Sequence, residues 1–398
     1  IDNSTGANVR ADINSALQAI ATNNTGSSAP STNYVSQFFA NTTSGIMQIN
    51  NTSGNAFINL FTLTGGPAFA VDGTINSVNI GKGANSVSGN TVLGESALDD
   101  SVSGENNTAI GKAALGAATS GANNTAVGAN ALDAVTTGSA NTALGRSALG
   151  ANTTAGNNTA VGYFSLLVNT TGASNTAVGT RSLDANSTGD SNTAIGLNAL
   201  TENTTASNNT ALGMEALKAN TTASNNVAVG RSALLVNTTG ADNTALGANA
   251  LDANTTASNN TAVGKAALGA NTTGSSNVAV GQGALSTNTT ASSNTAIGQN
   301  ALNTNSTGTL NTAVGKSALA SNNTGDNNTA VGVNTLLVNT TGASNTAVGR
   351  SSLEANTTGT NNVAFGQSAL FSNTSASNNT ALGRSALKNN TTGDKNVA

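Results

Sequence analysis

The sequence predicts a mainly β fold: a repetitive β-solenoid of 17-residue coils, preceded by a small α+β amino-terminal region. Two observations predict the solenoid. From Asn107 onward, one 17-residue unit recurs at constant spacing to the end of the chain. Within the unit, position one is always Asn, position five is always Gly and position nine is always Leu. Fixed self-similarity at a short period is typical of stacked arrays, in which neighbouring units bury each other's apolar faces.

The repeats account for most of the chain. With Asn107 as position one, later copies begin every 17 residues, and a looser copy begins at Asn90. Residues 90–398 therefore form a predicted shaft of eighteen full repeats, truncated in a further repeat at residues 396–398. Because the chain opens at Ile1 rather than Met and stops inside a repeat, we expect both ends of the protein to lie outside this sequence.

Each unit is expected to form short strands joined by corners. Gly and adjacent Thr or Ser residues are weak helix formers, whereas Asn and Gly accept left-handed backbone conformations at corners. We interpret positions two to four as one strand, the Ala-Leu segment at positions eight and nine as a second, and Asn-Thr-Thr-Gly as the return. An Asn that recurs at one corner predicts a ladder of side-chain amides that bond from coil to coil.

Positions of constant character are expected to face inward. These are the small and aliphatic positions three, four and nine, whereas positions six, seven, ten, eleven, sixteen and seventeen vary and are expected to face outward. Strand alternation also places position three opposite positions two and four, so that one set lines the coil and the other can meet another chain. The predicted ladder and core residues, given for three coils, are Asn107, Gly111, Leu115, Asn124, Gly128, Leu132, Asn243, Gly247 and Leu251.

Residues 1–70 differ from the array and are predicted to form an attachment region. Apolar side chains at spacings of four, four and three predict a short helix over residues 8–21. Three later stretches, rich in aromatic and branched side chains, predict a hairpin or small antiparallel sheet. They are residues 34–40, 46–50 and 56–63. Residues 71–89 are interpreted as a transition in which the coil begins to form.

Composition argues against an enzyme. The chain has 398 residues, of which 8% are charged, a net charge of -4, and no His or Cys. The commonest nucleophile and base pairs and soft-metal sites therefore have no residues to form them. The thirteen Lys and Arg residues suggest no basic stripe for nucleic acid, and no run of eighteen apolar residues exists. We expect no catalytic residue, no cofactor, no metal, no nucleic-acid partner and no membrane insertion.

The amino-acid sequences of two segments resemble known families. DNSTGANVRADINSALQAIATNNTGSSAPST, followed by YVSQFFANTTSGIMQINNTSGNAFINLFTL, resembles the amino-terminal region of bacteriophage tail-fibre proteins over residues 2–64. The array NTAVGxxALxxNTTG is similar to segments common in phage fibres and bacterial surface proteins. It is also similar to the SVAIG-type repeats of trimeric autotransporter adhesin heads, which form a left-handed β-roll in a trimer and have a shorter period.

The resemblance implies a function and partners. It implies a structural fibre subunit, whose shaft connects the virion tail to a host-recognition tip, in an extracellular virion fibre. It also implies a parallel homotrimer. Phage tail or adaptor proteins would contact residues 1–70, and the host surface would be contacted by a part that is not in this chain.

Other functions fit parts of the pattern. A bacterial trimeric surface adhesin is the first alternative. An ice-binding β-solenoid is the second, although the Thr-x-Thr strands that place two hydroxyls on one face are missing. Asn-Thr-Thr at Asn152 and Asn-Asn-Thr at Asn106 fit the glycan acceptor pattern, but glycans about 4.8 Å apart would collide. Asp at position ten and Lys or Arg at position six are interpreted as solubilising residues rather than calcium ligands.

Overall fold

The amino-terminal unit contains a small sheet. The computed structural model describes residues 25–26, 38–41, 46–50, 57–62, 73–75, 78–100 and 102–398, and the chain divides into two compact units, Ile1–Gly73 and Thr74–Ala398. In the first, β1 (Thr25–Gly26) pairs in parallel with β2 (Phe38–Asn41), and β2, β3 (Ile46–Asn50) and β4 (Phe57–Thr62) pair antiparallel. These last three strands overlap the predicted stretches. The predicted helix lies outside the described residues, so an α+β region remains a prediction.

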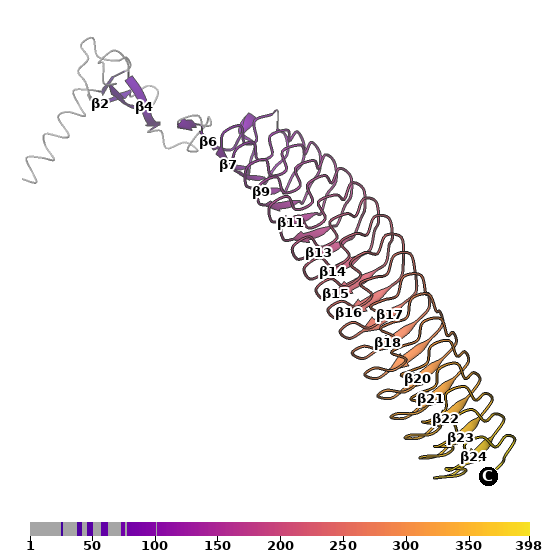
Figure 1. Ribbon diagram of the computed structural model, residues 1–398. Coiled ribbons are helices and arrows are strands. Elements are labelled where there is room, and N and C mark those ends of the chain that lie inside the picture. Colours follow the sequence, from indigo (N-terminus) through magenta and orange to yellow (C-terminus); the bar gives the residue numbers. More distant parts are fainter. Residues whose placement is uncertain are drawn as a thin grey trace, which may run out of the picture. The chain divides into compact units, whose positions relative to one another are not determined.

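The second unit is a β-solenoid in which each 17-residue repeat makes one coil (Figure 1). Consecutive strands pair in parallel at an offset of seventeen residues, as in Thr142↔Thr159 and Ala143↔Ala160. One strand occurs in each of the eighteen coils. They are β7 (Thr91–Gly94), β8 (Thr108–Ile110), β9 (Thr125–Val127), β10 (Thr142–Leu144), β11 (Thr159–Val161), β12 (Thr176–Val178), β13 (Thr193–Ile195), β14 (Thr210–Leu212), β15 (Val227–Val229), β16 (Thr244–Leu246), β17 (Thr261–Val263), β18 (Val278–Val280), β19 (Thr295–Ile297), β20 (Thr312–Val314), β21 (Thr329–Val331), β22 (Thr346–Val348), β23 (Val363–Phe365) and β24 (Thr380–Leu382).

The transition segment covers the first coil. Within residues 71–89 lie β5 (Gly73–Ile75), β6 (Val78–Gly81) and the short 3-10 helix η1 (Ala84–Ser86). β6 pairs antiparallel with β7, with Ile80 opposite Leu93. The amino-terminal edge of the parallel sheet is therefore paired rather than left open, which blocks one site of unwanted strand addition.

The predicted second strand at positions eight and nine is wrong. This segment is a turn in each coil, and Leu115 and Leu251 have φ angles of 54° and 51°, far from the φ near −120° of a parallel strand. The chain must reverse direction soon after a three-residue strand, and left-handed residues at positions seven and nine make that reversal tight. Leu251 N–H still donates to Ala267 O at 3.0 Å. Burial and this bond offset a left-handed conformation that costs about 1–2 kcal/mol in an L-residue.

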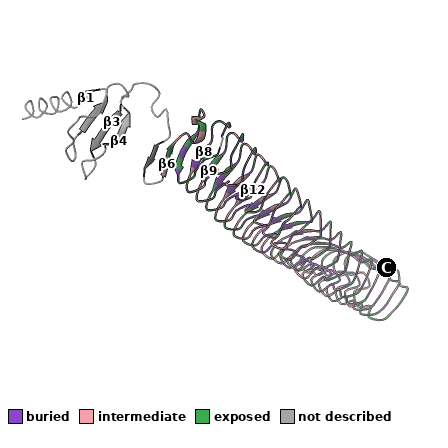
Figure 2. Cartoon of the chain, turned by 90° about the horizontal axis from the view of Figure 1, so that it is seen from above, coloured by how far each residue is buried: buried purple, intermediate pink, exposed green. Residues whose placement is uncertain are grey.

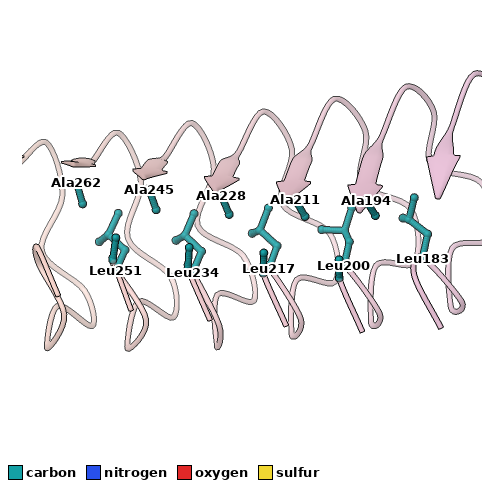
Figure 3. Packing of buried hydrophobic residues seen from close by; sticks show 14 of the residues in the cluster. Leu183, Ala194, Leu200, Ala211, Leu217, Ala228, Leu234, Ala245, Leu251 and Ala262 are labelled. Carbon is teal, nitrogen blue, oxygen red and sulfur yellow. The ribbon is translucent and has the colours of Figure 1, made fainter. Parts of the chain in front are cut away.

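Ala and Leu side chains fill the interior. Figure 3 shows the strand alanines and the position-nine leucines pointing toward one another across each coil, as Ala245 and Leu251 do. Both side chains are 0% exposed. The Ala at position eight, for example Ala250, completes this core in most coils. Figure 2 shows buried residues recurring from coil to coil along the shaft. From Asn107 onward the strand contributes only an Ala methyl group opposite Leu, whereas the first coil has the buried Val92 at this position.

The prediction that position four faces inward is wrong. The outer side of the strand carries position four, and Leu144, Leu246 and Phe365 are 47%, 46% and 53% exposed. The reason is the two-residue period of a strand: once Ala at position three points inward, positions two and four must both point outward. Of the two arrangements that strand alternation allows, the one with Ala inside is therefore confirmed.

Deleting one whole repeat tests the coil. Without residues 243–259, two equivalent backbone positions are joined and every ladder stays in register. We expect the chain to fold into a rod shorter by about 4.8 Å, from a stack of roughly 86 Å. Without residues 243–250, outward residues enter the core column beyond the cut and the stack should break. Electron micrographs in which both deletions give equally straight rods would contradict the coil assignment.

Charge placed in the core should open the stack. Leu251→Asp buries a carboxylate where no partner exists, and we expect several kcal/mol of destabilisation and faster proteolysis near this coil. Asp252→Ser, one residue along, removes a side chain on the outside of the coil that accepts one hydrogen bond from Asn249 at 2.9 Å. This control should change stability by less than about 1 kcal/mol. Equal loss of protease resistance in both variants would contradict the assigned orientation.

Candidate functional site

The candidate site is the repeating interior of the shaft, because that is where the unvarying residues meet. The leucines predicted as core, Leu115, Leu132 and Leu251, are 0% exposed, and so are Asn107, Asn124 and Asn243. Gly111, Gly128 and Gly247 adopt φ angles of 128°, 137° and 139°. The nine predicted residues thus belong to three continuous columns rather than to a pocket. Their arrangement can hold a rod together.

The first Asn column bonds mainly through the backbone. The backbone N–H of Asn124 donates to Asn107 Oδ1 at 2.9 Å, and the same bond recurs at every coil boundary with distances from 2.8 to 3.0 Å. Amide-to-amide bonds, the predicted form of the ladder, are added in only some coils, such as Asn141 Nδ2 to Asn124 Oδ1 at 3.2 Å. The predicted ladder exists, but the backbone supplies most of its donors.

Position twelve, expected only to form part of the return, makes a second Asn column. From Asn169 to Asn390 each side-chain Nδ2 donates to the Oδ1 one coil earlier, the first acceptor being Asn152, at 2.7 to 3.2 Å. This is an unbroken side-chain amide ladder. The signal was present, because fifteen of the eighteen repeats have Asn at position twelve.

The two columns share an acceptor. In the coil that starts at Asn243, the carbonyl oxygen of Ala257 accepts Asn243 Nδ2 at 2.9 Å and Asn254 Nδ2 at 3.0 Å. Position fifteen therefore joins the columns within a coil while each column joins successive coils. Buried amides are stabilising only when their donors and acceptors are paired. Among the described residues, Asn260 Nδ2 is the single buried side-chain N or O atom without a partner.

Position five requires glycine for two reasons. Its φ near +135° is strained for any residue with a Cβ. A Cβ on Gly247 would also lie 2.6 Å from the carbonyl carbon and oxygen of Gly264 in the next coil. Backbones of adjacent coils therefore approach each other where the strand ends. This close approach explains why Gly at position five has no exception.

Hydroxyl groups form a further column on the return. Thr238 Oγ1 donates to the Thr255 carbonyl at 3.0 Å, one coil further on, and similar bonds recur at position thirteen. Of the two glycan acceptor patterns, Asn152 in Asn-Thr-Thr is buried in the second Asn column, whereas Asn106 in Asn-Asn-Thr is exposed. The buried amide cannot accept a glycan without breaking the ladder.

Charged groups are sparse and mostly at the surface. Burial raises the pKa of the Asp184 carboxyl, while Arg181 and the Ala185 backbone N–H act in the opposite direction. Lys112 Nζ lies 3.3 Å from Glu95 Oε1 in the preceding coil, with both side chains exposed, so this pair contributes at most about 1 kcal/mol. The part of the chain that the structure describes contains no group of three potential metal ligands and no helix apolar and long enough to cross a bilayer.

No protein-family model, no curated protein and no solved structure matches this chain.

A matched pair of glycine substitutions tests the close approach. Gly247→Ala places a methyl group against the next coil's backbone at a positive φ, and we expect at least about 1–3 kcal/mol of destabilisation. Gly116→Ala is the control, because its φ is not positive and an added Cβ would lie 3.4 Å from its nearest contact, the carbonyl oxygen of Ala113, and this variant should change stability by less than about 0.5 kcal/mol. Thermal unfolding followed by circular dichroism measures both. Equal stabilities would contradict the assigned role of position five.

Proposed function

We propose that this chain is a structural fibre subunit, the shaft of a phage tail fibre that connects the virion tail to a host-recognition tip. In this proposal residues 1–70 attach the shaft to tail or adaptor proteins, three parallel copies form the fibre, and the host surface is contacted by a part outside this chain. The fibre is extracellular and performs no catalysis.

The observation that supports the proposal is the unbroken stack of equivalent coils. Each boundary is crossed by backbone bonds, by the first Asn column and, over most of the length, by the second. A rod built this way has a length proportional to its number of repeats, and each coil contacts only its neighbours. Such a rod is suited to holding two ends apart at a set distance. The resemblance of residues 2–64 to tail fibres supports the virion setting.

The two alternative functions, surface adhesin and ice binding, fit the shaft to different degrees. A surface adhesin could use the same shaft, and only its attachment to a cell would differ. For ice binding the geometry is less favourable, because fifteen of the eighteen strands present a single Thr beside an aliphatic side chain, as Thr142 and Leu144 do, and the other three present none. Ice-binding faces of the Thr-x-Thr kind would present two hydroxyls per strand. We therefore propose the fibre function alone.

Locating the protein tests this function. Antibodies raised against residues 90–398 should label fibres at the tails of purified virions in electron micrographs, and a full-length reading frame beside virion genes should accompany that result. Label on the bacterial envelope, with none on virions, would replace the fibre by the adhesin. Inhibition of ice recrystallisation by the purified chain would replace it by the ice-binding function.

A further inference from the structure

An uncharged stripe runs along the outside of the shaft. We define the strand face as the outward side chains at positions two and four of β7 to β24. Position two is Thr or Val and position four is Val, Ile, Leu or Phe in every coil. Eighteen coils at about 4.8 Å, each with three strand residues at about 3.3 Å, give roughly 860 Å². The apolar position-four column makes up about half of this area, roughly 430 Å², which is comparable to the largest apolar patch on a typical monomer, about 300–600 Å² and often functional.

Opposite charges border the two sides of this face. Position six follows the strand and forms the basic rim, with seven exposed Lys or Arg residues and one acid, Glu95, which pairs with Lys112. The basic residues are Lys112, Arg146, Arg231, Lys265, Lys316, Arg350 and Arg384. Positions sixteen and seventeen lead into the next strand and form the acidic rim, with five acids and one base, Lys395. The acids are Glu105, Asp190, Asp242, Asp326 and Asp394.

The rims select one relative orientation of two copies. If two copies place their strand faces together and run parallel about a common axis, the basic rim of one lies beside the acidic rim of the other. If the two copies run antiparallel with their strand faces still together, the two basic rims lie beside each other, and so do the two acidic rims. Like charges placed opposite each other suppress the wrong arrangement. The same parallel rule holds for three copies around an axis.

The spacing of the strands identifies the partner. A surface that repeats about every 4.8 Å over eighteen coils can be matched along its length only by a partner with the same axial repeat. A second copy of this chain has that repeat. The area of roughly 860 Å² is close to the about 800 Å² per partner of a stable interface. Nucleic acid fits this surface less well, because successive Lys and Arg residues of the basic rim are two to five coils apart.

We propose that the strand face is the surface through which copies of this chain associate, parallel and in register, with the basic rim of each against the acidic rim of the next. This inference rests on the part of the proposed function that makes the shaft an assembly of parallel copies. It does not depend on attachment to a virion. The position-four side chains meet at the common axis, and the varied positions ten and eleven stay in solvent.

Single cysteines test the surface, because the chain has no cysteine of its own. Ile110→Cys places a thiol on the strand face in the second coil, and Ser120→Cys places one on the exposed return of the same coil. A bifunctional maleimide that spans the about 10 Å between packed sheets should join the Ile110→Cys chains. In a three-fold assembly about two thirds of the chains should become covalent dimers, because two of the three thiols react with each other and the third has no unreacted thiol beside it. Antiparallel copies would place this coil at the far end of its partner and give no product.

Charge reversal tests the rims. Lys265→Glu, Lys316→Glu and Arg350→Glu together should weaken association about ten-fold or more at low salt. Adding Asp242→Lys and Asp326→Lys to the same chain reverses both rims over residues 242–350 and should restore association. Sedimentation measures assembly, and circular dichroism confirms that each variant is folded.

The outcomes separate the two proposals. If the unmodified chain stays monomeric at micromolar concentration, assembly itself is refuted, and with it the trimeric part of the proposed function. If the chain assembles but Ser120→Cys cross-links as well as Ile110→Cys, or rim reversal has no effect, this surface is wrong while the fibre function stands. Binding of DNA or RNA through the basic rim in place of self-association would also refute it.

Discussion

Hydrogen bonding between adjacent coils, repeated every seventeen residues, is the constraint on which the shaft depends. Each strand pairs with the equivalent strand of the next coil in a register offset by seventeen residues. The turns also bond to the next coil, as when Leu251 N–H donates to Ala267 O and Ala253 N–H donates to Gly269 O. Because backbone groups buried inside a narrow coil have no water to bond, every coil must follow the path of its neighbours. An insertion of one residue would displace all bonds beyond it at that boundary.

The unvarying side chains follow from this constraint. Asn suits both position one and position twelve, because the side-chain amide contains a donor and an acceptor. Stacked amides in successive coils can therefore bond to one another along the whole shaft. Leu and Ala fill a cross-section that leaves no room for a second large side chain. Gly stands where two backbones approach too closely for a Cβ. Where one column lapses, others remain: position twelve is Ser, Ala or Val in the first three coils, and the first Asn column continues there.

Many features of the shaft can be predicted from the sequence, but its turns and the orientation of its strand side chains cannot. The period, the first Asn column and the Leu core follow from identity at fixed positions, which needs no knowledge of backbone angles. The turn at Leu115 could not be predicted, since Leu rarely adopts positive φ and its neighbours cannot reveal it. The orientation of position four does not follow from its constancy, because a side chain can be constant without being buried inside its own coil. The second Asn column was overlooked because Asn-Thr-Thr also describes an ordinary turn. The helix predicted over residues 8–21 stays a prediction.

The constancy of position four is not explained by the fold of a single chain. It lies outside the coil, where positions six and ten accept Lys, Asp, Gln or Tyr, yet all eighteen copies are aliphatic or aromatic. Strand propensity alone does not require this, because Thr also has a high propensity and serves at position two of the same strands. An outward position that never becomes polar, between rims of opposite charge, indicates a constraint from outside the coil. Contact with an equivalent surface at the same spacing supplies such a constraint.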